Sequence, residues 1–364
     1  MPRMRSRRAV LALLAALAAV AAPSVAASPQ PASAASPTLH RTVSGWIPYW
    51  SAGTSYAVTL RNAAMFGTAS PFWYAAAAGS VRSETGAGNR TMIDGLHRAG
   101  VAVVPTVTSP LSASQVAGLG ADPVRRRAHV DALMRVVASR AYDGLDMNYE
   151  QMMFTTSRAQ AARTRAGYTA IATDLCRRLH AARKQCVITV LGRTSDAFSV
   201  WHAKLIPAVY DYAALGAIAD RVRVMAYDEH TGSTGPGPIA SIGWVEDIAR
   251  YTASRVAPAK VELGVPLYGR HWSGSSLVGS VTAPQAVALA RSAGARVRWS
   301  ATTASPRAAW TAGGQRHVVH FSDARSVAVR QALAKRYGFA GTALWAPGQE
   351  DPATWAQLRA GATW

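Results

Sequence analysis

Three polar side chains alternate along the segment 142–150 and have the types needed for acid–base chemistry. If the segment is a β-strand, Asp146, Asn148 and Glu150 project to one face, because successive side chains of a strand point to opposite faces. If both faces of the strand are covered, burial of these carboxyl groups without partners costs free energy or shifts their pKa. On its own, the row fits either a catalytic site or a strand with one solvated face.

The elements around this row favour a barrel. From residue 42 onward, short β-type runs alternate with helical patterns, which indicates βαβ units and a parallel sheet covered on both faces. Eight such runs match the strand count of a (β/α)8 TIM barrel, the α/β fold that we predict. The predicted strands are residues 43–50, 64–74, 101–108, 142–150, 186–193, 221–228, 260–269 and 339–346, and the predicted helices are residues 90–99, 123–139, 157–183, 200–219, 241–255 and 324–337.

Prolines within three of the predicted strands fit the same barrel. Pro48, Pro105 and Pro266 cannot donate to a strand ladder, but all three lie toward the carboxyl ends of their strands. Pairing gives way to loops there, at the rim where barrel enzymes build their active sites. The prolines therefore mark the rim.

A stretch of about 273–323, between the last two strands, is too long for a simple crossover. It contains short strand patterns at residues 297–300, 307–312 and 316–321, and the glycine pair 313–314 makes a good hairpin turn. We expect a small α+β insertion that walls one side of the cleft.

The start of the chain predicts export. Four arginines precede the apolar run 9–22, and small residues suited to signal cleavage follow it. The pair Arg7-Arg8 also fits a twin-arginine signal, so the export route stays open. We expect the signal peptide and the start of a linker in 1–34, a barrel over 42–364, no membrane span after cleavage, and a secreted or wall-associated monomer.

The chain is strongly basic. Its formal net charge is +20, and removal of the four signal arginines leaves +20 − 4 = +16. One explanation of this excess positive charge is a compositional bias that places arginines on the solvent-exposed surface. The other is that the charge retains the protein on an anionic polymer such as a cell wall. No basic run is interleaved with aromatic residues as single-stranded nucleic acid binding requires, so nucleic acid is not an expected partner.

Cys176 and Cys186 are the only cysteines. One lies in the predicted helix 157–183 and the other at the start of the next strand, and export would let a disulfide between them persist. We predict this disulfide, with two buried thiols as the alternative. His317 and His320 fall on opposite faces of a strand and do not suggest a metal site, so we expect no metal and no cofactor.

Five segments resemble glycoside hydrolase family 18, the chitinase family. The run Asp143-Gly144-Leu145-Asp146-Met147-Asn148-Tyr149-Glu150 resembles the family's Asp-Gly-x-Asp-x-Asp-x-Glu signature on its fourth barrel strand. Met225-Ala226-Tyr227-Asp228 is similar to the sixth strand, residues 264–270 to the seventh, Trp345 to the eighth, and residues 45–50 to the first. Residues 319–326 are similar to the branch with spore-cortex and peptidoglycan-cleaving members, a weaker resemblance.

This resemblance implies cleavage of an N-acetylglucosamine-containing polymer with retention and with the substrate's own acetamido group as nucleophile. Chitin, the glycan strand of peptidoglycan and an N-glycan core are the substrates left open. Glu150 would be the proton donor, Asp146 the neighbouring charge, and Tyr227 a hydrogen-bond donor to the acetamide oxygen. The implied substrate-binding residues are Asp228, Met225, Arg270, Trp345, Tyr49 and Trp73, the aromatic ones offering flat faces to sugar rings.

Asn148 departs from the family signature, which has aspartate at this position. The amide can still accept a hydrogen bond from the acetamide N–H, but it carries no charge to offset the cation that forms. Loss of such a group commonly costs about 2.7–4 kcal/mol, or roughly 100- to 1,000-fold in rate. Because Glu150 remains, we expect a slow hydrolase. The alternatives are a sugar-binding, lectin-like protein and a wall-associated structural protein.

Overall fold

The computed structural model describes residues 42–361 except 156, 197–198, 202–203 and 207. The predicted signal peptide and linker lie outside the described residues. Within the described part of the chain, no helix is both long enough and apolar enough to cross a membrane.

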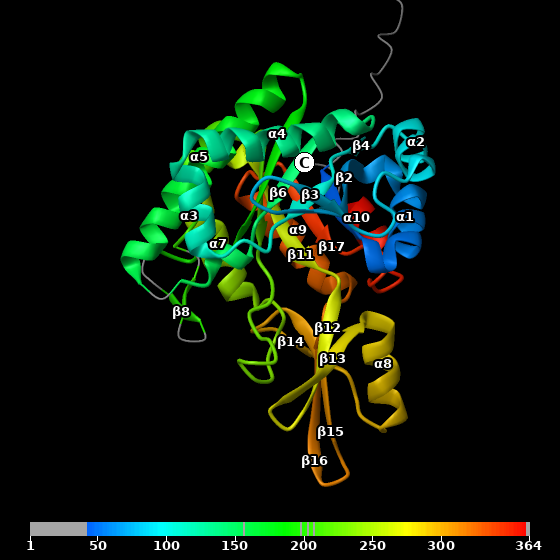
Figure 1. Cartoon of the computed structure of the whole chain (residues 1–364). Coiled ribbons are helices and arrows are strands. Elements are labelled where there is room, and N and C mark those ends of the chain that lie inside the picture. The colour runs from blue at the N-terminus through cyan, green and yellow to red at the C-terminus, as the bar shows by residue number, and fades with distance from the viewer. Residues whose placement is uncertain (1–41, 156, 197–198, 202–203, 207, 362–364) are drawn as a thin grey trace, which may run out of the picture. The chain divides into compact units, whose positions relative to one another are not determined.

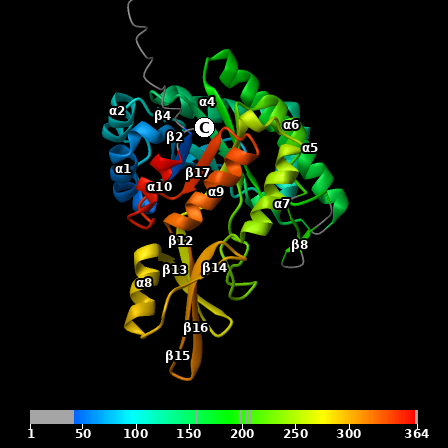
Figure 2. The same ribbon diagram turned by 180° about the vertical axis from the view of Figure 1, so that it is seen from behind.

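Parallel strands close into the predicted eight-stranded barrel (Figures 1 and 2), which confirms the fold class. The ring closes because β1 pairs with β2 on one side and with β17 on the other. The third strand is split in two at Pro105, where the ladder is interrupted. In chain order the barrel strands are β1 (Val43–Pro48), β2 (Phe66–Ala76), β4 (Ala102–Val103) with β5 (Thr106–Thr108), β6 (Gly144–Asn148), β7 (Gln185–Leu191), β10 (Arg221–Met225), β11 (Val261–Pro266) and β17 (Gly341–Trp345). The short β3 (Val81–Ser83) pairs antiparallel with the end of β2.

Helices flank the barrel on the outside (Figure 1). Several begin at side-chain caps: the Asp122 carboxylate accepts from the backbone N–H groups of Val124 and Arg125, and Pro123 occupies the first turn of α4. The helices are α1 (Ala52–Arg61), α2 (Arg90–Arg98), α3 (Ala113–Ala121), α4 (Pro123–Ser139), α5 (Arg158–Ala181), α6 (Tyr212–Ile218), α7 (Ile242–Ala253), α9 (Ala324–Arg336) and α10 (Thr354–Ala360).

The start of β6 depends on a glycine. A Cβ atom on Gly144 would lie 2.3 Å from the backbone oxygen of Gln185 on β7, so only glycine allows this close approach. The preceding Asp143 accepts from the Val103 backbone N–H at 2.7 Å and contacts His97 Nε2 at 2.8 Å. Asp143 and Gly144 therefore fix the register of β6 at the bottom of the barrel.

A five-stranded antiparallel sheet is inserted between β11 and β17, with strand order β13-β12-β16-β15-β14. Alanines of α8 pack on one of its faces against Ala308, Val319 and Phe321. The sheet starts at Tyr268, earlier than the predicted boundary, because the pairing of β11 with β17 ends at Pro266 and the chain then pairs with β16. Its elements are β12 (Tyr268–Ser273), β13 (Ser276–Thr282), α8 (Ala283–Ser292), β14 (Arg298–Ser300), β15 (Ser305–Ala312) and β16 (Gln315–Phe321).

Two predicted elements are wrong. The predicted strand 260–269 is divided between the barrel and the inserted sheet. The predicted helix 200–219 is replaced by the hairpin strands β8 (Ser199–Trp201) and β9 (Lys204–Ile206), and helix begins only at Tyr212. Proline at position 207 of the sequence is incompatible with a helix interior, and Asp211 caps the helix by accepting from the Ala214 N–H at 3.1 Å.

Helix α5 is tied to the barrel by a disulfide between Cys176 and Cys186 of β7, with Cα atoms 5.2 Å apart. Both cysteines are buried.

Candidate active site

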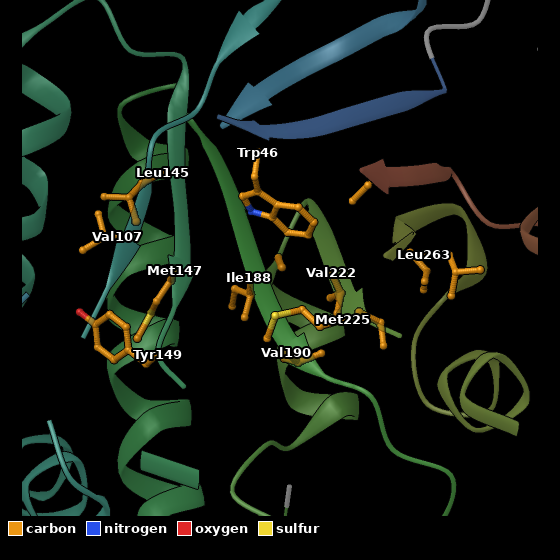
Figure 3. Close-up of a cluster of buried hydrophobic side chains, with 14 of the residues drawn as sticks. Trp46, Val107, Leu145, Met147, Tyr149, Ile188, Val190, Val222, Met225 and Leu263 are labelled. Carbon is orange, nitrogen blue, oxygen red and sulfur yellow. The ribbon is translucent and has the colours of Figure 1, made fainter. Parts of the chain in front are cut away.

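The polar row of β6 faces the barrel interior. Leu145, Met147 and Tyr149 are fully buried and lie on the side of β6 turned away from Trp46 (Figure 3). The Tyr149 hydroxyl contacts His129 Nε2 of α4 at 2.8 Å, which places this face against the outer helices. The alternate residues of β6 therefore project inward, where charge is tolerated only with partners.

Asp146 is completely buried and receives hydrogen bonds from four other strands. Its Oδ2 accepts from Trp46 Nε1 at 3.0 Å, Thr106 Oγ1 at 2.7 Å and Arg223 Nη1 at 3.3 Å, and its Oδ1 accepts from Thr189 Oγ1 at 2.7 Å. Its carboxyl group is thus held in place at the base of the row, in contact with a buried arginine and two positions before Glu150 along the strand.

Asn148 links the row to Glu150. Its side chain is buried, and Nδ2 donates to Glu150 Oε1 at 3.0 Å. The Oδ1 atom has no hydrogen-bond partner among the described residues. A buried amide oxygen without a partner is costly unless a ligand N–H or a water satisfies it.

Glu150 follows the end of β6 at the carboxyl-terminal mouth of the barrel. Burial raises the pKa of Glu150, and although the Asn148 hydrogen bond lowers it, the nearby charges of Asp228 and Asp146 raise it further. The net pKa lies above the ordinary value for a glutamate. A carboxyl group in this state can retain a proton near neutral pH and donate it, as a general acid must.

Tyr227 and Asp228 follow β10 at the same mouth. Burial raises the pKa of Tyr227, and the Glu150 charge raises it further, so the phenol stays a hydrogen-bond donor. Asp228 adopts a left-handed backbone conformation with φ of 67°. Its carboxylate accepts from the Tyr268 hydroxyl and pairs with Arg270 Nη2 at 2.7 Å.

Arg270 also donates to the backbone oxygen of His230 at 2.6 Å. Because Tyr268 and Arg270 belong to β12, these contacts attach the inserted sheet to the rim of the barrel. A cavity of about 260 Å³ lies at this junction. Its lining residues are Trp50, Asp228, Tyr268, Arg270, Ser280, Val281, Thr282, Gln285, Trp345 and Gln349.

Aromatic rings line the mouth at Trp345. Its ring centroid lies 5.1 Å from Phe72 and 6.2 Å from Trp50, whose side chain is 60% exposed. Tyr49 contacts Trp50 at 4.9 Å and is 37% exposed. Together these rings offer apolar faces to a sugar chain.

The assignment of Trp73 as a substrate-binding residue is wrong. This residue is completely buried and its ring packs 6.3 Å from Tyr142, so it has no face open to a sugar. Phe72, the preceding residue of β2, faces Trp345 instead. Because side chains alternate along a strand, Phe72 and Trp73 project to opposite faces of β2, and only one of them can face Trp345.

Sequence reasoning also missed Arg223, Thr106 and Thr189, the barrel residues that hold Asp146. The signal available for Arg223 was the alternation in 221–225, where arginine sits between two valines of a strand buried on both faces. For the two threonines no signal distinguished them from ordinary strand residues.

Metal ligands are not gathered at this mouth. Among the described residues, no group of three or more His, Cys, Asp or Glu side chains is arranged to hold a metal ion. His317 contacts His271 at 3.0 Å, whereas His320 packs against Trp272 on the other face of the inserted sheet.

An eight-stranded barrel with a buried carboxyl row at the end of its fourth strand is the arrangement of a TIM-barrel glycosidase. Residues 113–350 match the family model for glycosyl hydrolases family 18. The chain belongs to this glycosidase family.

Relatives of known description agree with this assignment. The cortical fragment-lytic enzyme of Bacillus anthracis is 33% identical over 155 residues, which cover 41% of this chain and 36% of that protein. The uncharacterized glycosylase YvbX of Bacillus subtilis is 25% identical over 242 residues, 65% of this chain and 66% of the relative. The first curated relatives are thus matched over only 36% to 66% of their own lengths. A chitinase from Chromobacterium violaceum superposes with a TM-score of 0.78 and 28% identity, covering 89% of this chain and 99% of the chitinase.

Proposed function

We propose that the protein is an exported hydrolase that cleaves a polysaccharide containing N-acetylglucosamine by substrate-assisted catalysis with retention. The observation that carries this proposal is the Glu150 carboxyl group, whose pKa is raised and which lies at the barrel mouth beside the unpartnered Oδ1 of Asn148. A proton donor and a free amide acceptor are what an N-acetylated sugar requires in this mechanism.

In the first step, Glu150 donates its proton to the glycosidic oxygen as the bond from that oxygen to the anomeric carbon breaks. The acetamide oxygen of the same sugar bonds to the anomeric carbon, giving a cyclic oxazolinium ion. Tyr227 donates its phenol O–H to that acetamide oxygen, and Asn148 Oδ1 accepts from the acetamide N–H. Glu150, now a carboxylate, then takes a proton from water as the water oxygen attacks the anomeric carbon and the acetamide is released.

Asn148 limits the rate of this cycle because it is neutral. The oxazolinium ion gains a hydrogen bond to Oδ1 but no opposite charge, and Asp146 is already paired with Arg223. Removal of a well-placed electrostatic group typically costs about 2.7–4 kcal/mol, so we propose a slow enzyme rather than an inactive one.

Substrate binding is assigned to the rim. Trp345 and Tyr49, with Trp50 beside them, supply apolar ring faces, and Asp228 with Arg270 supplies polar contacts around the cavity. Met225, the last residue of β10, lies at the same mouth.

The substrate is either chitin or the glycan strand of peptidoglycan. A cortical fragment-lytic relative supports peptidoglycan, and a chitinase of similar structure supports chitin. Export, and retention on an anionic wall through the net charge of +16 that remains after removal of the four signal arginines, would place the protein with either polymer as a monomer.

The test compares the mature protein with its Glu150→Gln variant on a fluorogenic chitobioside, on chitin oligomers and on purified peptidoglycan. We expect turnover by the unmodified protein, loss of it in the variant, and product ends in mass spectra that identify the cleaved linkage. Equal background signals from both proteins on every substrate would refute hydrolysis.

A sugar-binding, lectin-like protein is the second candidate, favoured by Asn148 alone. It predicts that chitin oligomers bind to both proteins with equal affinity and that neither protein releases products. A lectin has no use for a proton donor, and the raised pKa of Glu150 therefore supports the enzyme.

A further inference from the structure

The proton donor of the proposed reaction lies just beyond the end of its strand. Among the described residues, the ladder of β6 ends at Asn148 on the β5 side and at Met147 on the β7 side. Tyr149 and Glu150 follow the ladder and are not part of it. Because a general acid acts only from a defined position, other contacts must hold the peptide that carries the Glu150 side chain.

One such contact comes from Tyr210, which lies two residues before the start of α6. Its hydroxyl donates to the backbone oxygen of Tyr149 at 2.8 Å, one residue before Glu150. The direction of this bond is fixed, because a carbonyl oxygen can only accept. Burial raises the pKa of Tyr210, and the neighbouring Tyr168 and Glu150 raise it further, so the phenol keeps the proton that it donates.

Tyr210 is itself held firmly. It is completely buried, and its ring packs edge-on at 5.5 Å from the ring of Tyr168 on α5. The next residue, Asp211, caps α6 by accepting from the Ala214 N–H at 3.1 Å. A side chain without exposed surface does not touch a substrate, so Tyr210 can influence turnover only through the backbone that it contacts.

The side chain of Tyr149 is held from another direction, by His129 of α4. Burial lowers the pKa of His129 more than its hydrogen bonds to backbone oxygens raise it, so the ring is neutral at pH 7. Nδ1 lies 2.9 Å from the Ala77 oxygen, which only accepts, and therefore Nδ1 carries the proton. Nε2 then accepts from the Tyr149 hydroxyl at 2.8 Å. Residue 149 is thus held at both its backbone oxygen and its hydroxyl.

The bonds of Glu150 itself are local. Its backbone oxygen accepts from the Met153 N–H at 2.9 Å, and its Oε1 accepts from Asn148 Nδ2 at 3.0 Å. Both partners lie within three residues of Glu150 and move with it. Tyr210 and His129, in contrast, tie the segment to other elements of the barrel, and Tyr210 does so at the peptide that joins residues 149 and 150.

We propose that Tyr210 is a positioning residue for the proton donor: its hydroxyl holds the Tyr149–Glu150 peptide and thereby places the Glu150 carboxyl group at the barrel mouth. This inference rests on the proposed hydrolase function and adds to it a residue that does not touch the substrate. A displacement of about 1 Å in an active site can lower a rate about 100-fold, so even a smaller shift of this peptide is measurable.

Tyr212 offers a matched control. It is 2% exposed, and its hydroxyl donates to the backbone oxygen of Leu191, the last residue of β7. The two tyrosines make the same kind of bond to the ends of adjacent strands, but only β6 leads into Glu150. Tyr210→Phe and Tyr212→Phe each remove one hydroxyl and keep the ring, so both variants should fold and lose comparable thermal stability.

The experiment measures kcat, KM and the melting temperature of the unmodified protein and of both variants, with the fluorogenic chitobioside as substrate. We expect kcat to fall about tenfold in Tyr210→Phe while KM stays within about twofold, because the surface that binds the sugar is unchanged. In Tyr212→Phe, kcat should stay within about twofold of the unmodified value. Equal kcat values in the two variants would indicate a merely structural role and overturn the proposal, as would a raised KM with unchanged kcat in Tyr210→Phe.

A second measurement needs no turnover. Glu150 is the one glutamate of the sequence that follows a tyrosine, so ¹³C in tyrosine carbonyls combined with ¹⁵N in glutamate gives a single NMR signal, from the Tyr149–Glu150 peptide. We expect its carbonyl shift to move upfield in Tyr210→Phe, because the carbonyl loses its hydrogen bond, and to stay unchanged in Tyr212→Phe. The same shift in all three proteins would contradict the proposal. If no glycan is hydrolysed, the proposed function fails, while this signal still decides whether Tyr210 holds the peptide.

Discussion

Replacement of Asn148 by aspartate is the most direct test of how the row works. The change places a second carboxyl group at the 3.0 Å that now separates Asn148 Nδ2 from Glu150 Oε1, in a site where residue 148 is 1% exposed. Two full charges at this distance would repel by about 5 kcal/mol at an effective dielectric constant of 20, so the pair must share one proton. That proton is the one Glu150 donates.

The rate should rise for an electrostatic reason. Once Glu150 has given up its proton, an aspartate at 148 can accept from the acetamide N–H and oppose the oxazolinium charge. An interaction of this kind is worth about 2.7–4 kcal/mol, which corresponds to a 100- to 1,000-fold higher kcat for Asn148→Asp. The alkaline limb should also move to higher pH, because the lowering effect of the amide hydrogen bond on the Glu150 pKa is lost.

The assay is steady-state hydrolysis of the fluorogenic chitobioside across pH, with Asn148→Ala as the control that removes the hydrogen bond and adds no charge. If Asn148→Asp leaves kcat unchanged or lowers it while the protein stays folded, the electrostatic account of position 148 is wrong.

Three further predictions concern stability. Because burial raises the pKa of Glu150 in the folded state, ionisation of Glu150 lowers the free energy of unfolding as pH rises above the unfolded-state pKa of about 4.3. Glu150→Gln should therefore have a higher melting temperature than the unmodified protein at pH 7 and the same melting temperature below about pH 4. Equal melting temperatures of the two proteins at both pH values would contradict this prediction. Gly144→Ala should destabilise by about 1–3 kcal/mol or more in urea unfolding, because the new Cβ would meet Gln185 at 2.3 Å, whereas Gly53→Ala in α1 meets nothing within 4 Å and should not destabilise. The Cys176–Cys186 disulfide closes a loop with a sequence separation of 10, so its reduction should lower the free energy of unfolding by about 3 kcal/mol. An unchanged denaturant midpoint in reducing buffer would refute this prediction.

The sequence by itself determined the barrel and the strand that carries the row. Alternation of apolar and polar residues in 142–150 is a local property, and burial of Leu145, Met147 and Tyr149 against the helices follows from it directly. Prolines and caps also act locally, which is why Asp122 with Pro123 marks the start of α4 at the predicted residue. The helix assigned to 200–219 failed where the local pattern was ambiguous and a hairpin formed instead.

Only the tertiary structure decided the partners of Asp146. Trp46, Thr106, Thr189 and Arg223 come from four different strands, and the longest separation between Asp146 and any of them is 100 residues. Closure of the barrel brings these side chains to one point, and no pattern within a single strand encodes that meeting. The same closure turned Phe72 rather than Trp73 toward Trp345, because the face of a strand is fixed by its neighbours on both sides.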